Sequence, residues 1–522
     1  MKQLRKNVAR PFYATLAVLA LAVSLFSVGS RGNTPLDDDP PQDSGEAPPP
    51  TLTATDVDQI VKTVAAAVNV PYVIAVTDRQ GDILAVYRKA NAPATATANF
   101  SIQADANEVA VALARTAGFF SNSQAPLSSR TVRYISGIHF PPGIMFTGNA
   151  ALYGIENTNR GCPFNTTFAP GQDVPPSRSI DGTTTGLGIL TGKANVNDSD
   201  PNAVNPGGVP LFKNGTLVGG VGVAGASFDI TEFAALSGES AGSGFGPVVP
   251  PPGVVIIDGI ALPFVNQTTR PSGLSAGSAD GDYLPGHAPI DAPKPAPEGY
   301  LVAPHAGPLG GLSADEVASI VTNTVNTGNI TRAVIRLPLG SRARFVIAVA
   351  DLDGQLLALF RMPDATIFSI DVAVAKSRNV IYFSGPTRLP SELPGVPMGT
   401  ALTNRSIEFA AQPLFPPGVD YGSPGAFFNL YKFDTANPCT QGAQAANPYQ
   451  SGIVFFPGAV PLYRNGQMVG GLGVSGDGVE QDDFATAGGA VNFQAPANIR
   501  ADRVFVQGVR LPYIKFPRNP TF

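Results

Sequence analysis

The stretch VPLYRNGQMVGGLGVSG at residues 460–476 decides the fold of this chain, because it describes a complete β-hairpin. An apolar run precedes Asn465-Gly466 and a glycine-rich apolar run follows. Asn-Gly is a strong signal for a two-residue type I′ turn, since both central positions need positive φ. Residues 209–225 read VPLFKNGTLVGGVGVAG and predict the same hairpin around Asn214-Gly215.

The hairpin is one of several segments that occur twice in the same order, so we searched the chain for a repeat of whole domains. The other matched pairs are LTATDV at 52–57 with LSADEV at 312–317, VIAVTD at 73–78 with VIAVAD at 346–351, VAVALAR at 109–115 with VAVAKSR at 372–378, FPPGI at 140–144 with FPPGV at 415–419, and DGIALPF at 258–264 with QGVRLPY at 507–513. Six collinear matches predict two tandem copies of one domain.

Each copy is predicted to be an antiparallel sheet flanked by helices. Thr53 with Asp56, and Ser313 with Glu316, have the spacing of a capping box and predict where a first helix begins. A hairpin, a second helix and the Asn-Gly hairpin follow in each copy. This order of elements indicates the α+β class. The glycines of the last strand predict close packing of the backbone or a bulge.

The repeat also divides the chain into segments. We expect a signal peptide at 1–29, a disordered tether at 30–51, copy 1 at 52–265, a Pro/Gly-rich linker at 266–311 and copy 2 at 312–516. Basic residues followed by an apolar run predict export to the periplasm or the medium, the alternative being an uncleaved membrane anchor. No later segment is apolar enough to predict a membrane span.

Composition narrows the classes of partner. The formal net charge is -5 and only 14% of residues are charged, so nucleic-acid binding is not expected. The two cysteines, Cys162 and Cys439, lie at comparable places in the two copies. We interpret them as two free thiols, with a bridge between the copies as the alternative.

The order of these motifs resembles the GlcG/HbpS family, most closely at residues 460–476 followed by Glu480-Gln-Asp482. The resemblance covers most of both copies. It implies a profilin-like domain, assembly into dimers or larger oligomers and, for some members, heme binding. On this basis we expect an intramolecular pseudo-dimer that can also form homo-oligomers, and heme as the first candidate ligand.

Heme needs an axial ligand beside an apolar pocket, and His139 is the single histidine within either copy. It is a weak candidate for binding iron, because Leu414 stands at the matching place in copy 2. Tyr153 and Tyr431 lie in corresponding segments and are candidates to ligate or stack, although packing in the core is the more common role of such tyrosines.

Charged residues in the matched segments are candidates to bind the carboxylates of a ligand. Arg130 and Arg405 recur at corresponding places, while Asp371, Lys376 and Glu480 lie in the best-matched parts of copy 2. Salt links between a helix and the sheet are the alternative role for these residues.

Three functions are consistent with these features. The first is an exported protein that binds a small ligand, heme or another tetrapyrrole. The second is a structural protein of the cell envelope that keeps the fold without the ligand. The third is an enzyme, which has the least support because no catalytic motif is present.

Overall fold

The computed structural model describes residues 48–98, 102–153, 159–183, 186–188, 190, 204–248, 255–257 and 259–521. The expected signal peptide at 1–29 and most of the expected tether lie outside the described residues. Residues 49–522 form one compact unit that contains both copies. Among the helices of the described segments, none has the length and apolar character needed to cross a membrane.

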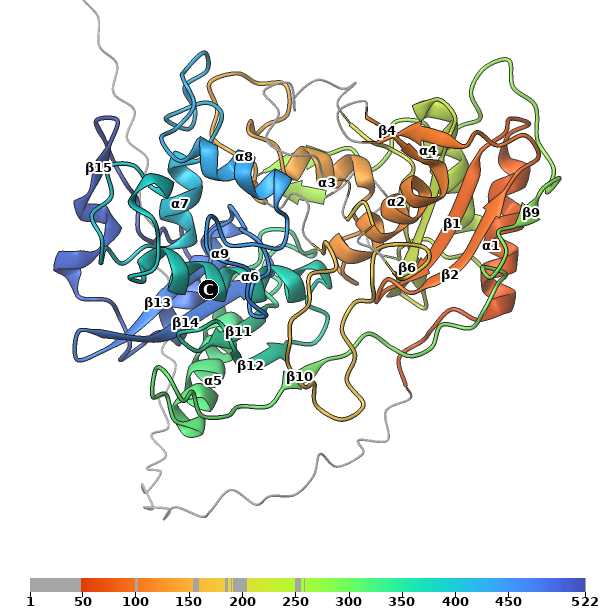
Figure 1. The fold of residues 1–522 in the computed structure, drawn as a ribbon. Helices are drawn as coiled ribbons and strands as arrows, with labels where there is room; N and C mark the ends of the chain where they lie inside the picture. The colour runs from red at the N-terminus through yellow and green to blue at the C-terminus, as the bar shows by residue number, and fades with distance from the viewer. Residues whose placement is uncertain are drawn as a thin grey trace, which may run out of the picture. The chain divides into compact units, whose positions relative to one another are not determined.

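Copy 1 is built around a five-stranded antiparallel sheet with the strand order β5-β6-β1-β2-β9 (Figure 1). Its elements are α1 (Ala54–Ala67), β1 (Val73–Asp78), β2 (Ile83–Arg88), β3 (Thr95–Thr97), β4 (Gln103–Asp105), α2 (Ala106–Phe120), α3 (Ser129–Ile135), β5 (Gly208–Lys213), β6 (Thr216–Ala224), α4 (Phe228–Ser237), β7 (Val255–Ile257), β8 (Ile260–Leu262) and β9 (Asp282–Tyr283). Helix α2 packs on one face of this sheet, and α1 and α4 pack together against the other face.

Copy 2 has a five-stranded sheet with the order β10-β12-β11-β14-β13, in which β11 to β14 are connected like β1, β2, β5 and β6, while the edge strand β10 precedes the other strands in the chain and β9 follows them. Its elements are β10 (Gly299–Val302), α5 (Ala314–Ile330), β11 (Val346–Ala350), β12 (Leu356–Arg361), α6 (Phe368–Ser384), α7 (Asn404–Ala410), α8 (Phe428–Ala436), β13 (Ala459–Arg464), β14 (Gln467–Ser475), α9 (Val479–Gly489), β15 (Phe505–Val506) and β16 (Val509–Arg510). Helix α6 covers one face, and α5 and α9 cover the other. The predicted α+β class is confirmed.

Local signals in the sequence correspond closely to these elements. Both capping boxes form, at Thr53 with Asp56 and at Ser313 with Glu316. Both Asn-Gly turns have two successive residues of positive φ, with values of 51° at Asn465 and 78° at Gly466. These predictions are confirmed. The sequence could predict both features because each depends only on groups that are neighbours in the chain.

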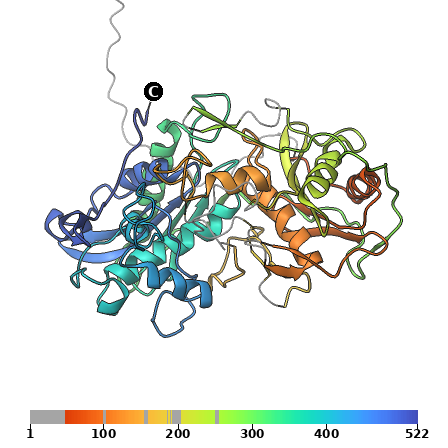
Figure 2. The ribbon, with the colours of Figure 1, turned by 90° about the horizontal axis from the view of Figure 1, so that it is seen from above.

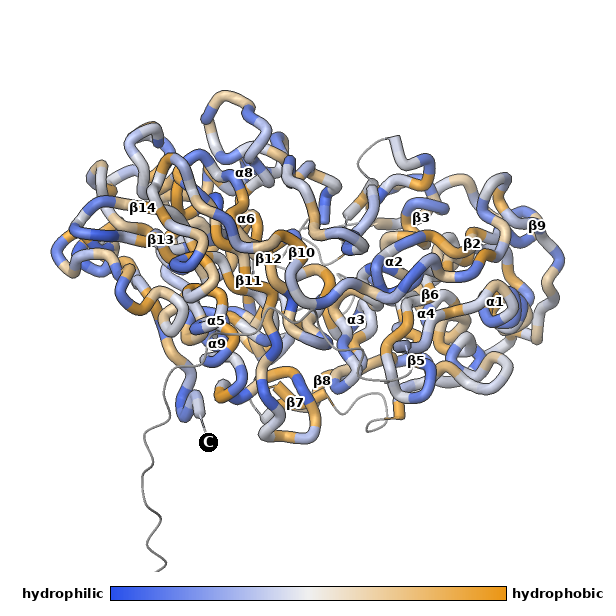
Figure 3. Tube along the Cα trace, turned by 90° about the horizontal axis from the view of Figure 1, so that it is seen from below, coloured by the Kyte–Doolittle hydropathy of each residue, from blue (hydrophilic) through white to orange (hydrophobic). Residues whose placement is uncertain are grey.

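The glycine-rich strands allow the central helices to approach the sheets closely. A Cβ atom on Gly473 of β14 would collide with the carbonyl oxygen of Ala373 in α6, and one on Gly222 of β6 would collide with that of Ala110 in α2. The strands beneath α6 are almost wholly apolar, as the orange colour of β11 and β12 shows in Figure 3. Close packing of backbone on backbone is thus the role of these glycines.

The segment expected to be a linker adds an edge strand to each sheet. Strand β9 pairs with β2 of copy 1, and β10 pairs with β12 of copy 2. In the view of Figure 2 the green chain of this segment runs along the surface between the two sheets. Residues 266–311 therefore take part in the folded structure of both copies.

The two copies share part of their hydrophobic core. The rings of Phe120 at the end of α2 and Phe368 at the start of α6 stack with their centroids 4.2 Å apart. Both are fully buried, in a cluster that also contains the core residues of copy 2. Separation of the copies would expose this apolar surface to water.

Candidate functional site

A pocket of about 500 Å³ lies between copy 1 and copy 2, a volume typical of sites for small molecules. Its walls come from the loop after α3 of copy 1, from α7 and the start of α9 in copy 2, and from the chain that follows β15. The lining residues are Gly148, Asn149, Ala150, Tyr153, Arg405, Glu408, Phe409, Gln412, Pro417, Pro457, Val479, Glu480, Asp502, Arg510, Leu511, Pro512, Tyr513, Ile514 and Lys515. Three residues predicted from the sequence, Tyr153, Arg405 and Glu480, therefore share one pocket.

Arg405 anchors the floor of this pocket and is not a free anion-binding group. Its Nε donates to Asp483 of α9, and one Nη donates to the carbonyl oxygen of Val479 at 3.3 Å. Burial alone would lower the pKa of Arg405, but the attraction of Asp483 outweighs it and raises that pKa. The guanidinium is charged and already neutralised by a buried carboxylate.

The corresponding arginine of copy 1 is held in the same manner. Arg130 of α3 and Glu232 of α4 form a buried ion pair, with 2.6 Å between Nε and Oε1. Glu232 Oε2 also accepts hydrogen bonds from the backbone N–H groups of Asn266 and Gln267. The repeated arginine thus joins two helices within each copy, which explains why it recurs in the sequence.

Glu408 is one of the pocket residues that sequence reasoning missed. It is buried in α7, and its Oε1 accepts hydrogen bonds from Asn149 Nδ2 at 2.8 Å and Gln412 Nε2 at 2.6 Å. Burial raises the pKa of Glu408 to about 7. The repeat conceals this residue, because Arg133 stands at the matching place in copy 1.

The mouth of the pocket carries cations. Lys515 pairs with Glu480 while its side chain stays 65% exposed, and Arg510 also lines the pocket. Deeper in the pocket, the buried Oδ1 of Asn149 has no hydrogen-bond partner among the residues described. The buried Oδ1 of Asp502, which also lines the pocket, likewise has no partner within the described segments. The pocket therefore combines apolar walls with accessible cations and buried acceptors.

Lys376 and Asp371 lie outside this pocket, Lys376 in the interior of copy 2 and Asp371 at the contact with copy 1. Lys376 of α6 is fully buried, with its Nζ 2.9 Å from Asp482 and 2.8 Å from the carbonyl oxygen of Val474. Burial raises the pKa of Asp482 to about 7 and lowers that of Lys376. Asp371 accepts a hydrogen bond from the backbone N–H of Asn159 in copy 1. Both charged side chains serve packing within or between the copies.

Tyr431 and His139 are also engaged in packing. Tyr431 of α8 is buried against Phe428 and Phe455, with ring centroids 5.7 and 5.1 Å away. His139 of copy 1 is buried, with its Nε2 2.9 Å from Asp420 Oδ1 of copy 2. It does not line the pocket. Of the iron-ligand candidates named from the sequence, only Tyr153 lines the pocket.

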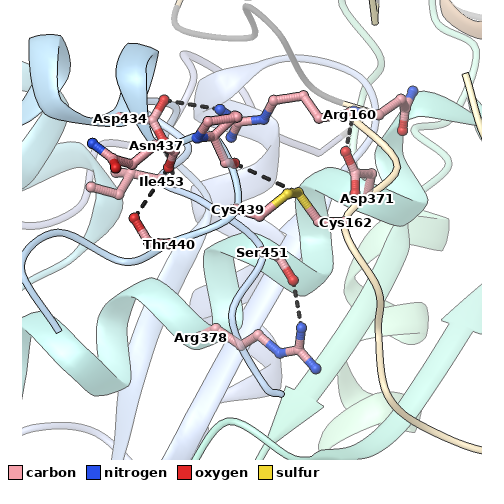
Figure 4. The surroundings of a disulfide bond; sticks show 12 residues. Arg160, Cys162, Asp371, Arg378, Asp434, Asn437, Cys439, Thr440, Ser451 and Ile453 are labelled. Carbon is pink, nitrogen blue, oxygen red and sulfur yellow. Dashed lines mark hydrogen bonds and ion pairs between the residues drawn. A yellow bond between two sulfur atoms is a disulfide. The ribbon is translucent and has the colours of Figure 1, made fainter. Parts of the chain in front are cut away.

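The cysteines form a bond between the copies, so the interpretation as two free thiols is wrong. Cys162 and Cys439 are linked by a disulfide with their Cα atoms 5.6 Å apart, although 277 residues separate them in sequence (Figure 4). Close by, Arg160 of copy 1 pairs with Asp434 of α8 at 3.1 Å. Sequence spacing does not reveal such a pair, because only the tertiary fold brings the two loops together.

Comparison with known proteins shows that part of this chain is similar to a known family. Residues 329–490 match the family model described as "Haem degrading protein HbpS-like". The matched segment includes α7 and the start of α9, which line the pocket.

A curated relative and two solved structures are similar to parts of the chain. The corrinoid adenosyltransferase PduO of Salmonella typhimurium is 29% identical over 165 residues, which are 31% of this chain and 37% of that enzyme. A crystal structure described as a PduOC:heme complex is 20% identical and covers 35% of this chain and 96% of its own, with a TM-score of 0.23. A double mutant of Streptomyces reticuli HbpS is 16% identical and covers 39% and 97%, with a TM-score of 0.21.

Proposed function

We propose that the pocket between the copies binds a partly apolar small molecule that carries carboxylates, with heme or another tetrapyrrole as the first candidate. The observation that carries this proposal is the pocket itself, with apolar walls around Ile514 and Pro457 and the cations Arg510 and Lys515 at its mouth. Lys and Arg suit carboxylates, and apolar walls suit a flat ring system. Heme is preferred because the description of the matching family refers to haem.

The residues of the pocket fit the ring and the carboxylates of heme better than they fit its iron. Tyr153 and Tyr513 are the lining residues of a type that can ligate heme iron, and the described lining contains no His, Cys or Met. Tyr513 is almost fully buried, and its burial raises its pKa, which keeps the phenol protonated. We therefore expect binding to depend chiefly on the ring and its carboxylates.

A titration with two matched ligands tests this proposal. Hemin and iron-free protoporphyrin IX are added separately to the protein, and binding is followed by Soret absorbance and by porphyrin fluorescence. We expect both to bind with one-to-one stoichiometry and with affinities within about tenfold of each other. Saturable binding of neither ligand would contradict the proposal and favour a structural role for the fold.

Substitutions in the pocket show where the ligand binds. Gly148→Leu should fill part of the pocket, because Gly148 lines it and a Cβ atom at this position meets no atom within 4 Å. Arg510→Ala together with Lys515→Ala should weaken binding by about tenfold, as expected for two lost contacts to carboxylates. Lys62→Ala removes an exposed lysine of α1 and serves as the control.

We also propose that the protein is exported and works as a covalent pseudo-dimer, with copy 1 sharing the ancestry of copy 2. The disulfide between Cys162 and Cys439 supports an oxidising compartment. The shared order of four strands in each sheet supports common ancestry. Cell fractionation, with the thiols blocked before lysis, tests the first part: recovery of reduced protein in the cytoplasm would contradict export.

A further inference from the structure

The turn between β1 and β2 places a buried carboxylate, Asp78, against a second pocket. Asp78 Oδ1 accepts hydrogen bonds from the backbone N–H groups of Gly81 at 2.7 Å and Asp82 at 2.9 Å. Its Oδ2 is buried and has no partner within the described part of the chain. The residue is only 3% exposed and lines a pocket of about 420 Å³.

Copy 2 shows how the same carboxylate is satisfied when partners are present. Asp351 is the equivalent of Asp78, and its oxygens accept hydrogen bonds from the backbone N–H groups of Leu309 at 2.9 Å and Gly310 at 2.6 Å. These two residues belong to the chain that leads into helix α5. In copy 2 the peptide backbone itself therefore fills this place.

Copy 1 has prolines where copy 2 has these two donors. Counting back from the matched Leu52 and Leu312, Pro49 stands for Leu309 and Pro50 for Gly310. Proline has no N–H, so neither residue can donate to Asp78. Both prolines line the pocket beside Asp78.

The equivalence of these positions holds in space as well as in sequence. Lys213 Nζ donates to the carbonyl oxygen of Thr51 at 3.1 Å, and Arg464 Nη1 donates to that of Gly311 at 3.1 Å. Lys213 and Arg464 are matched residues of the two Asn-Gly hairpins. Thr51, which follows the two prolines of copy 1, and Gly311, which follows Gly310 of copy 2, therefore contact the same position of their hairpins. The chain enters both copies by the same path.

The pocket offers a donor as well as an acceptor. The side chain of Arg79, next to Asp78, is 11% exposed, and its Nη2 donates to Asp364 at 2.7 Å. Its Nε is buried and finds no hydrogen-bond partner in the segments that the structure describes. A buried group without a hydrogen bond is unfavourable, and a ligand of matching polarity can supply the missing bond.

We propose that the Asp78 pocket is a binding site for a small molecule with an amide group, which takes the place that backbone amides occupy in copy 2. The amide N–H donates to Asp78 Oδ2, and an acceptor on the ligand faces Arg79 Nε. Thr51 and Val218 provide further walls. This site is separate from the pocket lined by Arg405 and Glu408, and the two share no lining residue.

Binding of simple probes tests the proposal. Propionamide, N,N-dimethylpropionamide and propylammonium are compared by saturation-transfer NMR with the intact protein. Propionamide has donors and an acceptor, the dimethyl compound lacks donors, and propylammonium lacks an acceptor. We expect saturable binding of propionamide and at least tenfold weaker binding of the other two. Equal signals from propionamide and its dimethyl analogue would overturn the proposal, as would preference for propylammonium.

A graft from copy 2 locates the probe at Asp78. The double variant Pro49→Leu with Pro50→Gly restores two backbone N–H groups and should weaken propionamide binding by at least tenfold. Should it fail to fold, Pro50→Gly alone restores one donor. Asp351→Asn, at the satisfied site of copy 2, is the matched control and should leave probe binding unchanged. Undiminished binding by a folded graft would refute the location.

Discussion

Asn149 of copy 1 donates a hydrogen bond from Nδ2 to Oε1 of Glu408 in copy 2 across a distance of 2.8 Å. This contact closes the pocket between the copies and leaves the Oδ1 of Asn149 buried without a partner among the described residues. The carboxyl group of Glu408 is buried with it, and this burial raises its pKa to about 7. The pocket thus depends on both copies and on a group whose charge changes near neutral pH.

Glu408→Gln should make the protein less sensitive to pH. Because burial raises the pKa of Glu408 from 4.5 to about 7, the folded state binds more protons than the unfolded state between these values. The free energy of unfolding due to this group is therefore highest below pH 4.5 and falls until about pH 7, by about 1.4 kcal/mol for each pH unit in that interval. The free energy of unfolding of the variant, measured as its difference from wild type, should therefore be more favourable at pH 8 than at pH 5. Urea unfolding at both values measures this, and an equal effect of the substitution at both would contradict it.

Loss of the disulfide should weaken the whole unit. Cys162 and Cys439 close a loop of 277 residues, so the bond restricts the unfolded chain strongly. We expect Cys162→Ser with Cys439→Ser to lower the free energy of unfolding by about 2–5 kcal/mol. Denaturation with and without dithiothreitol measures the effect. The reductant should destabilise only the wild type, because the chain has no other cysteine.

Removal of one partner from the buried ion pair of α6 should be costly. Lys376→Met leaves Asp482 buried without its counter-charge, which typically costs about 3–5 kcal/mol. Lys376→Met combined with Asp482→Leu should recover most of this loss. The matched control is Lys62→Ala, since Lys62 pairs with Asp58 on the surface and such pairs contribute about 0–1 kcal/mol. A single variant as stable as the control would show that the pair is not buried in solution.

A methyl group on the glycine-rich strand should also destabilise copy 2. Gly473→Ala places a Cβ atom against the carbonyl oxygen of Ala373, and the separation of α6 from the sheet should cost about 1–3 kcal/mol. Gly148→Ala is the control, because open space surrounds that position. Thermal unfolding of the two variants compares them directly. Equal melting temperatures would show that helix and sheet are not in close contact.

Several features of this protein follow from its sequence alone. The capping boxes at Thr53 and Ser313 and the turns at Asn214-Gly215 and Asn465-Gly466 are local, because a few neighbouring residues satisfy their hydrogen bonds and dihedral angles. The α+β class follows from the order of such elements. A residue that occurs at the same place in both copies can also indicate the same contact in both. Arg130 and Arg405 recur because each forms an ion pair that joins two helices.

Which residues come into contact depends on the tertiary structure. Glu408 and Asn149 are 259 residues apart, and neither belongs to a motif that would pair them. The disulfide and the surroundings of Asp78 likewise depend on where distant loops come to lie. Hydrogen bonds, burial and the pKa values that follow from burial act through space over a few ångströms. Sequence determines the elements of this chain, while contacts across its two copies determine the sites.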